Sequence, residues 1–154
     1  YLWDKGDPKK AFDKAINYAN KVVMSLSDQF CVERHKSHFY ELVKNNIDIT
    51  FANEQEIKSL INTDSFSDVV SFGKQTKKHL IVTRGSKGAI AIKGSETVEH
   101  PAATNLQIID LTGAGDLFAA GYLHGEINNF SVHKCLEQGT ILSSNIIQTL
   151  GARL

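Results

Sequence analysis

The segment D-L-T-G-A-G-D-L-F-A-A-G, from Asp110 to Gly121, constrains the fold of this chain more than any other. It follows a short apolar run, Leu106 to Ile109, that predicts a strand, and it continues into an alanine-rich stretch with helical spacing. A strand, a tight turn at Gly113 and Gly115 and the start of a helix are therefore expected here. Unpaired N–H groups and the dipole of a helix N-terminus can hold a phosphate group, which glycine allows to approach closely.

Asp116 falls in the first turn of this expected helix. An acidic side chain is unexpected in a site for anions unless it handles a proton, so Asp116 is a candidate general base beside a developing oxyanion. A purely structural explanation also fits. Acidic residues in a first turn compensate the helix dipole, and Gly-x-Gly is an ordinary turn.

Two other strands are followed by polar residues. The alternating strand Ile47 to Ala52 precedes Asn53 and Glu56, whose spacing predicts a capping box at the start of a helix. The strand His79 to Thr83 runs into the sequence R-G-S-K-G, residues 84–88, which predicts either a ligand-binding loop or a hairpin turn into the next strand.

The pattern of periodic segments predicts alternating strands and helices. Helices are expected over residues 8–21, 35–44, 54–62, 65–75, 113–127 and 131–150, and strands over 22–26, 47–52, 79–83, 89–92, 96–99 and 106–109. Ser131 is expected to cap the last helix and Gly151 to close it. This order predicts a three-layer α/β/α fold with a mostly parallel sheet and an antiparallel edge. Ligands of such sheets bind beyond the carboxyl ends of the strands, where Asn53, Thr83 and Asp110 are expected.

Composition excludes several classes of function. The chain has 154 residues, of which 17 are Lys or Arg and 17 are Asp or Glu, so charge gives no reason to expect nucleic acid or an anionic membrane as partner. No apolar run approaches the length of a membrane span. The chain has no G-x-x-x-x-G-K-[ST] loop, no protein-kinase motifs and no G-x-G-x-x-G after its first strand.

Cysteine usage favours a reduced, cytoplasmic protein. Cys31 and Cys135 are far apart in sequence and neither belongs to a C-x-x-C pair. Cys31, His35 and His38 would share one face of a continuous helix, which is compatible with metal binding. No fourth ligand accompanies them, so a solvated surface is the favoured interpretation.

The three glycine- and asparagine-containing segments resemble, in order and spacing, the signatures of the PfkB (ribokinase-like) carbohydrate and nucleoside kinases. The D-L-T-G-A-G-D-L-F run is similar to the family's D-T-x-G-A-G-D-x-F, with Leu111 replacing threonine. N-E-Q-E, residues 53–56, resembles N-x-x-E, and T-R-G-S-K-G, residues 83–88, resembles T-x-G-x-x-G. The segment L-S-D-Q-F-C-V-E-R-H, residues 26–35, resembles adenosine-kinase-like bacterial members.

The resemblance implies ATP-dependent transfer of a γ-phosphoryl group to a hydroxyl of a sugar or nucleoside. It implies that Asp116 accepts the proton of that hydroxyl and that Gly113, Ala114 and Gly115 stabilise the transferred group. It also implies that Glu56 organises Mg²⁺ through water and that Asn53 contacts phosphate. The nucleotide would be bracketed by Thr83, Arg84, Gly85, Ser86 and Gly88, with Thr140 and Ser144 lining the adenine pocket.

A monovalent cation, K⁺, is a further implication of the resemblance. Its ligands would be Asp110 and Thr112 with backbone oxygens near Ile146, Thr149 and Gly151. The alternative is that Asp110 caps the turn and that the other residues form an ordinary helix end.

Members of this family are about twice as long, so residues 1–154 are expected to be one nucleotide-binding domain from the C-terminal half of a kinase, without the substrate and lid half. The fragment is then expected to be inactive and to self-associate through an exposed apolar face, whereas the intact enzyme could form a homodimer. The rival hypothesis is a non-catalytic nucleotide-binding domain of a degenerate or regulatory kinase.

Overall fold

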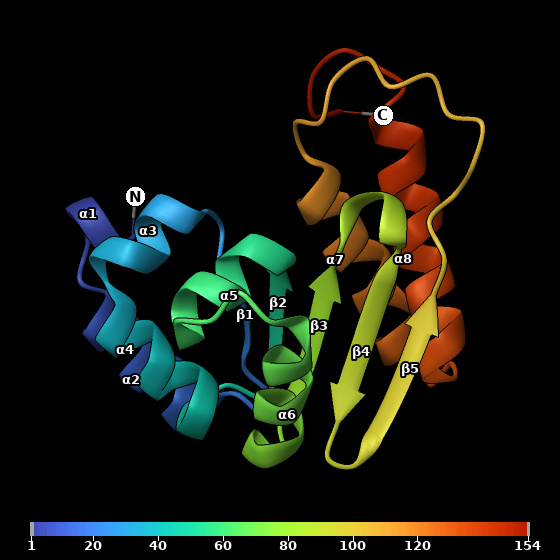
Figure 1. Cartoon of the computed structure of the whole chain (residues 1–154). Helices are drawn as coiled ribbons and strands as arrows, with labels where there is room; N and C mark the ends of the chain where they lie inside the picture. Colours follow the sequence, from blue (N-terminus) through green and yellow to red (C-terminus); the bar gives the residue numbers. More distant parts are fainter. Residues whose placement is uncertain (1, 154) are drawn as a thin grey trace. The chain divides into compact units, whose positions relative to one another are not determined.

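The computed structural model describes residues 2–153, which fold into alternating helices and strands (Figure 1). In chain order these are α1 (Leu2–Lys5), α2 (Pro8–Tyr18), β1 (Val23–Ser25), α3 (Gln29–Arg34), α4 (Lys36–Glu41), the π-helical turn η1 (Leu42–Asn46), β2 (Ile49–Asn53), α5 (Glu54–Ile61), α6 (Phe66–Thr76), β3 (His79–Thr83), the 3₁₀ turn η2 (Gly85–Lys87), β4 (Ala89–Lys93), β5 (Glu96–His100), α7 (Ala114–Ile127) and α8 (Val132–Ile146).

The strands form one mixed sheet in the order β1-β2-β3-β4-β5. β1 and β2 are parallel, with Val23 opposite Ile49. β4 and β5 run in opposite directions and are joined by a two-residue turn in which Gly94 has a φ of 58° (Figure 1). The first four residues of β2, β3 and β4 are all buried, which is typical of strands covered on both faces.

The chain divides into two compact units, which we describe separately. The first contains residues up to 81 together with 92–96, and the second contains residues 82–91 and those from 97 onward.

In the first unit, the helix predicted over 35–44 is wrong in its start and in its continuity. The Asp28 side chain accepts a hydrogen bond from the Cys31 N–H at 2.8 Å, so the helical segment already begins at Gln29. The backbone of His35, with φ −120°, then interrupts it between α3 and α4, and the segment ends in the π-helical turn η1.

This interruption removes the shared helix face on which a Cys31, His35 and His38 metal site would depend. The rings of His35 and His38 lie against Trp3 instead, with centroid distances of 5.7 and 4.8 Å. Phe39 stacks on the same indole at 4.2 Å and is fully buried. Among the side chains that the structure describes, no group of three or more His, Cys, Asp or Glu could hold a metal ion.

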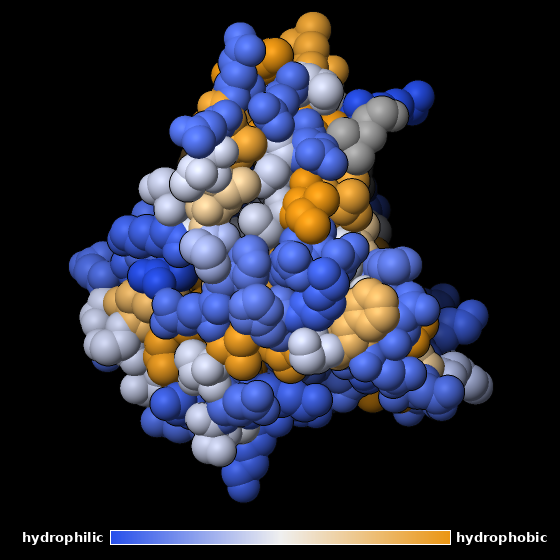
Figure 2. Space-filling model, turned by 90° about the vertical axis from the view of Figure 1, so that its right-hand side faces the viewer, coloured by the Kyte–Doolittle hydropathy of each residue, from blue (hydrophilic) through white to orange (hydrophobic). Residues whose placement is uncertain are grey.

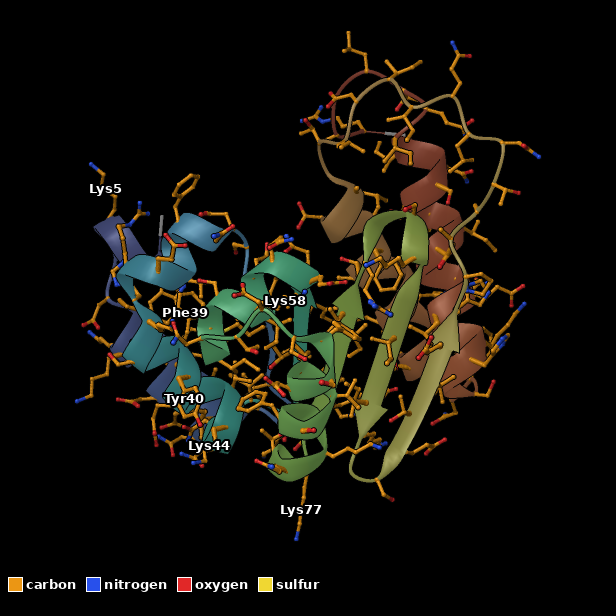
Figure 3. All side chains as sticks on the ribbon, viewed as in Figure 1. Lys5, Phe39, Tyr40, Lys44, Lys58 and Lys77 are labelled. Carbon is orange, nitrogen blue, oxygen red and sulfur yellow. The ribbon has the colours of Figure 1, made fainter. Side chains whose placement is uncertain are left out.

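A second aromatic contact joins α4 to α6 in this unit. The Tyr40 ring lies 5.7 Å from the ring of Phe72, and the ammonium group of Lys44 lies 5.5 Å from the Tyr40 ring centroid. Figure 3 shows Tyr40 and Lys44 side by side on the outer surface of this unit, whereas Phe39 points inward. The helices therefore hold together through aromatic contacts in addition to aliphatic burial.

In the second unit, α7 and α8 pack so closely that there is no room for side chains at the glycines between them. A Cβ on Gly121 would lie 2.5 Å from the carbonyl oxygen of Gln138, and one on Gly139 would lie 2.8 Å from that of Phe118. A Cβ on Gly125 would lie 2.9 Å from the sulfur of Cys135. Since successive residues of α7 meet earlier residues of α8, the two helices are antiparallel.

Two predictions for this unit are wrong. Residues 106–109 form no strand, because the Ile109 and Asp110 N–H groups donate to the Ile147 carbonyl at 2.8 and 3.3 Å instead of to a neighbouring strand. The last helix ends at Ile146, so Gly151 (φ 86°) does not close it. The cap at Ser131 is confirmed, since its side chain accepts from the Lys134 N–H at 3.3 Å.

Several large apolar side chains of the second unit stay exposed. Ile108, Ile109 and Leu111 are 62%, 54% and 65% exposed, just before the glycine turn. On the face drawn in Figure 2, such apolar surface alternates with polar surface. None of the helices in the described part of the chain is long and apolar enough to cross a bilayer.

Candidate phosphate and nucleotide site

The glycine turn begins α7. Gly113 is its N-cap residue with a left-handed backbone (φ 81°), a conformation that favours glycine, and Ala114, Gly115 and Asp116 form the first turn. No described residue accepts a hydrogen bond from the backbone N–H of Gly115 or Asp116. Two adjacent donors at the positive end of a 14-residue helix are therefore free to bind an anion.

Gly115 has a further property that the fold does not explain. A Cβ at this position would meet nothing within 4 Å, and the backbone is not left-handed. Alanine would favour the helix at such a position by up to about 1 kcal/mol. The missing side chain instead leaves open space beside the two free donors, which is the space that a ligand would need.

Asp116 is exposed in this first turn, as a proton acceptor for a bound molecule must be. Asp110, on the other side of the turn, has a structural role in the chain as it stands. Its Oδ1 accepts from the Thr112 N–H at 2.9 Å and the Thr112 hydroxyl at 2.7 Å, and its Oδ2 accepts from the Gly151 N–H at 3.0 Å. These bonds, those of Thr112 foremost, lower the pKa of Asp110 below its ordinary value.

The proposed cation ligands are thus partly brought together. Asp110, Thr112 and Gly151 are directly hydrogen-bonded, whereas the Ile146 carbonyl accepts both the N–H and the hydroxyl of Thr149, at 3.0 and 2.9 Å. The two bonds from Thr149 to the Ile146 carbonyl are those of an ordinary helix end. The monovalent-cation site stays a prediction.

A cavity of about 480 Å³ opens beside the glycine turn, within the second unit. This is a usual size for a small-molecule site. Its lining is mostly apolar, and its polar side chains are hydroxyls only. The lining consists of Thr83, Gly85, Ser86, Gly88, Ala89, Ala102, Ala103, Leu106, Ile108, Leu111, Ala114, Gly115, Phe118, Thr140, Ser143, Ser144 and Ile147.

The loop between β3 and β4 forms one wall of this cavity. The Arg84 N–H donates to the Gly88 carbonyl at 2.8 Å, and both Gly85 (φ 57°) and Gly88 (φ 86°) are left-handed. A Cβ on Gly88 would overlap the carbonyl oxygen of His100. The segment is therefore a hairpin turn, as one of the two alternatives predicted, and it also lines the cavity; ligand binding by this loop stays a prediction.

The predicted capping box is present in the first unit. The Asn53 side chain accepts from the Glu56 N–H at 2.9 Å, while the two Glu56 oxygens accept from the Asn53 side-chain amide at 2.7 Å and its N–H at 2.8 Å. Glu56 is only 5% exposed. Burial raises its pKa, the Asn53 N–H opposes the rise, and the nearby charge of Asp28 adds to it.

The structure therefore gathers most of the predicted nucleotide residues around one cavity: Thr83, Gly85, Ser86, Gly88, Ala114, Gly115, Thr140 and Ser144 line it, whereas Arg84, Gly113 and Asp116 do not. Asn53 and Glu56 belong to the other unit. No sequence motif marks the loop after β5, whose Ala102, Ala103, Leu106 and Ile108 line the cavity, or Asp28, whose charge acts on Glu56. The N-cap signal at Asp28 could have found the latter.

Comparison with known proteins places this chain in one family. The family described as pfkB family carbohydrate kinase matches residues 2–154. A nucleoside kinase of Methanocaldococcus jannaschii is 28% identical over 151 residues, covering 96% of this chain and 48% of that protein.

Solved structures of kinases are also similar to this chain. An adenosine kinase from Sinorhizobium meliloti is 35% identical with a TM-score of 0.94, over 100% of this chain and 49% of that one. A probable sugar kinase from Rhizobium etli is also 35% identical, with a TM-score of 0.93 over 99% and 48%. The predicted α/β/α fold is thereby confirmed.

This chain belongs to the pfkB family of carbohydrate kinases, as its motifs predicted. It spans about half the length of the relatives it matches.

Proposed function

We propose that this chain is the nucleotide-binding part of a kinase that transfers the γ-phosphoryl group of ATP to a hydroxyl of a sugar or nucleoside. The observation that carries the proposal is Gly115, which lines the cavity, keeps its N–H free and leaves open a space that no residue of the described chain fills. Family membership and the relatives' names, nucleoside, adenosine and probable sugar kinase, support it.

The phosphate groups would bind at the start of α7. The free N–H groups of Gly115 and Asp116 and the helix dipole stabilise the negative charge that the transferred group carries. Phosphoryl transfer depends mainly on positioning and charge neutralisation, so these donors supply much of the catalysis. The carboxylate of Asp116 accepts the proton of the attacking hydroxyl.

Glu56 and Asn53 suit an indirect magnesium site. A buried carboxylate with a raised pKa beside a second acidic side chain, Asp28, is a costly arrangement that a nearby cation relieves. Each Glu56 oxygen accepts one hydrogen bond from Asn53 and retains a lone pair for a water molecule. Mg²⁺ held through such a water molecule would supply positive charge for phosphate oxygens.

The nucleoside of ATP would occupy the apolar cavity between the β3–β4 loop and α8. The acceptor would be held by the half of the family's fold that this chain does not span. The 154-residue chain alone is therefore expected to bind ATP without catalysing phosphoryl transfer. Well-oriented reactants account for about 7–11 kcal/mol of such catalysis, which an absent acceptor site forfeits.

Two measurements test the proposal. Calorimetry of the 154-residue chain with ATP and Mg²⁺ should show binding, and its absence would contradict the nucleotide assignment. Phosphorylation of adenosine, ribose and fructose is then followed in a protein that joins this chain to the other half of the fold. Asp116→Asn should lower kcat by at least about 100-fold with little change in ATP affinity.

An unchanged kcat in Asp116→Asn would overturn the assignment of the base. ATP binding without transfer to any acceptor would favour the rival hypothesis of a non-catalytic domain.

A further inference from the structure

Thr140 on α8 presents a hydroxyl to the cavity whose proton is already committed. Its Oγ1 lies 2.9 Å from the carbonyl oxygen of Leu136, one turn earlier. A carbonyl oxygen can only accept, so the hydroxyl must donate to it. Any other partner of this oxygen meets its lone pairs.

His100, at the end of β5, is the other polar group near the Thr140 hydroxyl, and it does not accept the hydroxyl proton. Its Nδ1 lies 2.9 Å from the Pro101 carbonyl oxygen and 3.4 Å from Thr140 Oγ1. Because the Pro101 carbonyl accepts, Nδ1 carries the hydrogen, and it cannot accept the Thr140 proton. The His133 ring packs edge-on against His100, with centroids 5.2 Å apart.

Thr140 lies at the far end of the cavity from the phosphate-binding turn. Gly113 lies beside Ala152, which follows the end of α8. Ile147 and Thr140 both line the cavity, and the step of seven positions from Thr140 to Ile147 corresponds to about 10 Å along a helix. A nucleotide whose phosphates bind at Gly115 would thus place its base near Thr140.

We infer that Thr140 selects nucleotides whose base presents an amino group, as adenine does, over bases that present a carbonyl oxygen at the same position. The inference rests on the proposed function. An exocyclic amino group donates to the lone pairs of Thr140 Oγ1 while the bond to Leu136 stays intact, whereas a carbonyl oxygen receives the Thr140 proton only when that bond is broken. Thr140 is the specificity-determining residue, and His100 is a positioning residue that keeps its hydroxyl turned toward Leu136.

The test compares ATP with ITP, in which a carbonyl oxygen replaces the C6 amino group of adenine and the neighbouring N1 carries a hydrogen. Calorimetry of the wild-type chain with Mg²⁺ should show at least about tenfold tighter binding of ATP. Thr140→Val, which keeps the shape and removes the oxygen, should weaken ATP binding until the two affinities are equal. Thr140→Ser should retain the preference.

His100→Phe tests the positioning role through the relative binding of ATP and ITP, which a purely structural role of His100 would leave unchanged. With Nδ1 gone, the Thr140 hydroxyl can turn and donate to a carbonyl group, so ITP binding should become tighter while ATP binding weakens. His100→Asn, which restores an N–H donor near the same place, should behave like the wild type.

Equal binding of ATP and ITP by the wild type would overturn the inference and leave the proposed function standing. Binding of neither nucleotide would overturn both.

Discussion

Replacing Gly115 by alanine should separate stability from function in this protein. The position is the second residue of α7, its backbone is not left-handed, and the added Cβ would meet nothing within 4 Å. Alanine is favoured over glycine in a helix by about 0.5–1 kcal/mol. The unfolding free energy should therefore rise by up to that amount, which corresponds to an increase in Tm of about 1–4 °C.

The same methyl group would stand in the space from which a phosphate reaches the free N–H groups of Gly115 and Asp116. The N–H groups would remain, but the methyl group would keep a phosphate from approaching them closely. We expect calorimetry to show loss of ATP binding in the Gly115→Ala chain, while thermal unfolding monitored by circular dichroism shows an equal or higher Tm.

Gly121→Ala is the matched control in the same helix. Its Cβ would lie 2.5 Å from the carbonyl oxygen and 2.8 Å from the carbonyl carbon of Gln138, which are backbone atoms that cannot move aside cheaply. Overpacking of this kind costs about 1–3 kcal/mol, so Tm should fall. A Gly115→Ala chain that is destabilised like Gly121→Ala, or that binds ATP normally, would refute the reasoning.

Three more predictions concern the other site residues. Asn53→Ala removes the capping box and should lower the unfolding free energy by about 1–2 kcal/mol in denaturant titrations, whereas Ala at the exposed Gln55 should change it little. Asp110 has a lowered pKa when folded, so its stabilisation is present above the ordinary value of 3.8 and disappears as the pH falls through the folded value; the Tm difference between wild type and Asp110→Asn should vanish in acid, and a constant difference would contradict this. If Asp110 and Thr112 hold K⁺, the activity of the joined protein should fall when a large organic cation replaces K⁺ in the buffer. Equal activity in the two cations would mean that Asp110 only caps the turn.

Local signals predicted those elements whose boundaries depend on neighbouring residues. The strand His79–Thr83 has the predicted bounds, because β-branched residues precede a glycine loop. The capping box of Asn53 and Glu56 also follows from spacing three residues apart. The glycine turn was predictable because helix starts, left-handed glycines and free donors are all properties of a few adjacent residues.

Elements that depend on distant partners were not predictable in the same way. Residues 106–109 resemble a strand in their apolar character, but the Ile109 N–H donates to the Ile147 carbonyl just beyond the end of α8, and the Gln107 N–H donates to the Gln148 side chain. The break at His35 is accompanied by contact of its ring with Trp3, more than thirty residues away in the chain. The lining of the cavity by the loop after β5 likewise depends on tertiary contacts such as that of Gly88 with His100.

The antiparallel α7–α8 pair has a consequence for the order of folding. The two helices are joined by only the residues from Asn128 to Ser131, so bringing them together closes a short loop at small entropic cost. The parallel pairing of β1 with β2 instead joins Val23 to Ile49 across an intervening helical segment. Local contacts form faster than distant ones. The helical hairpin that carries Gly115 and Thr140 should therefore gain hydrogen-exchange protection early in refolding, before the first strands pair.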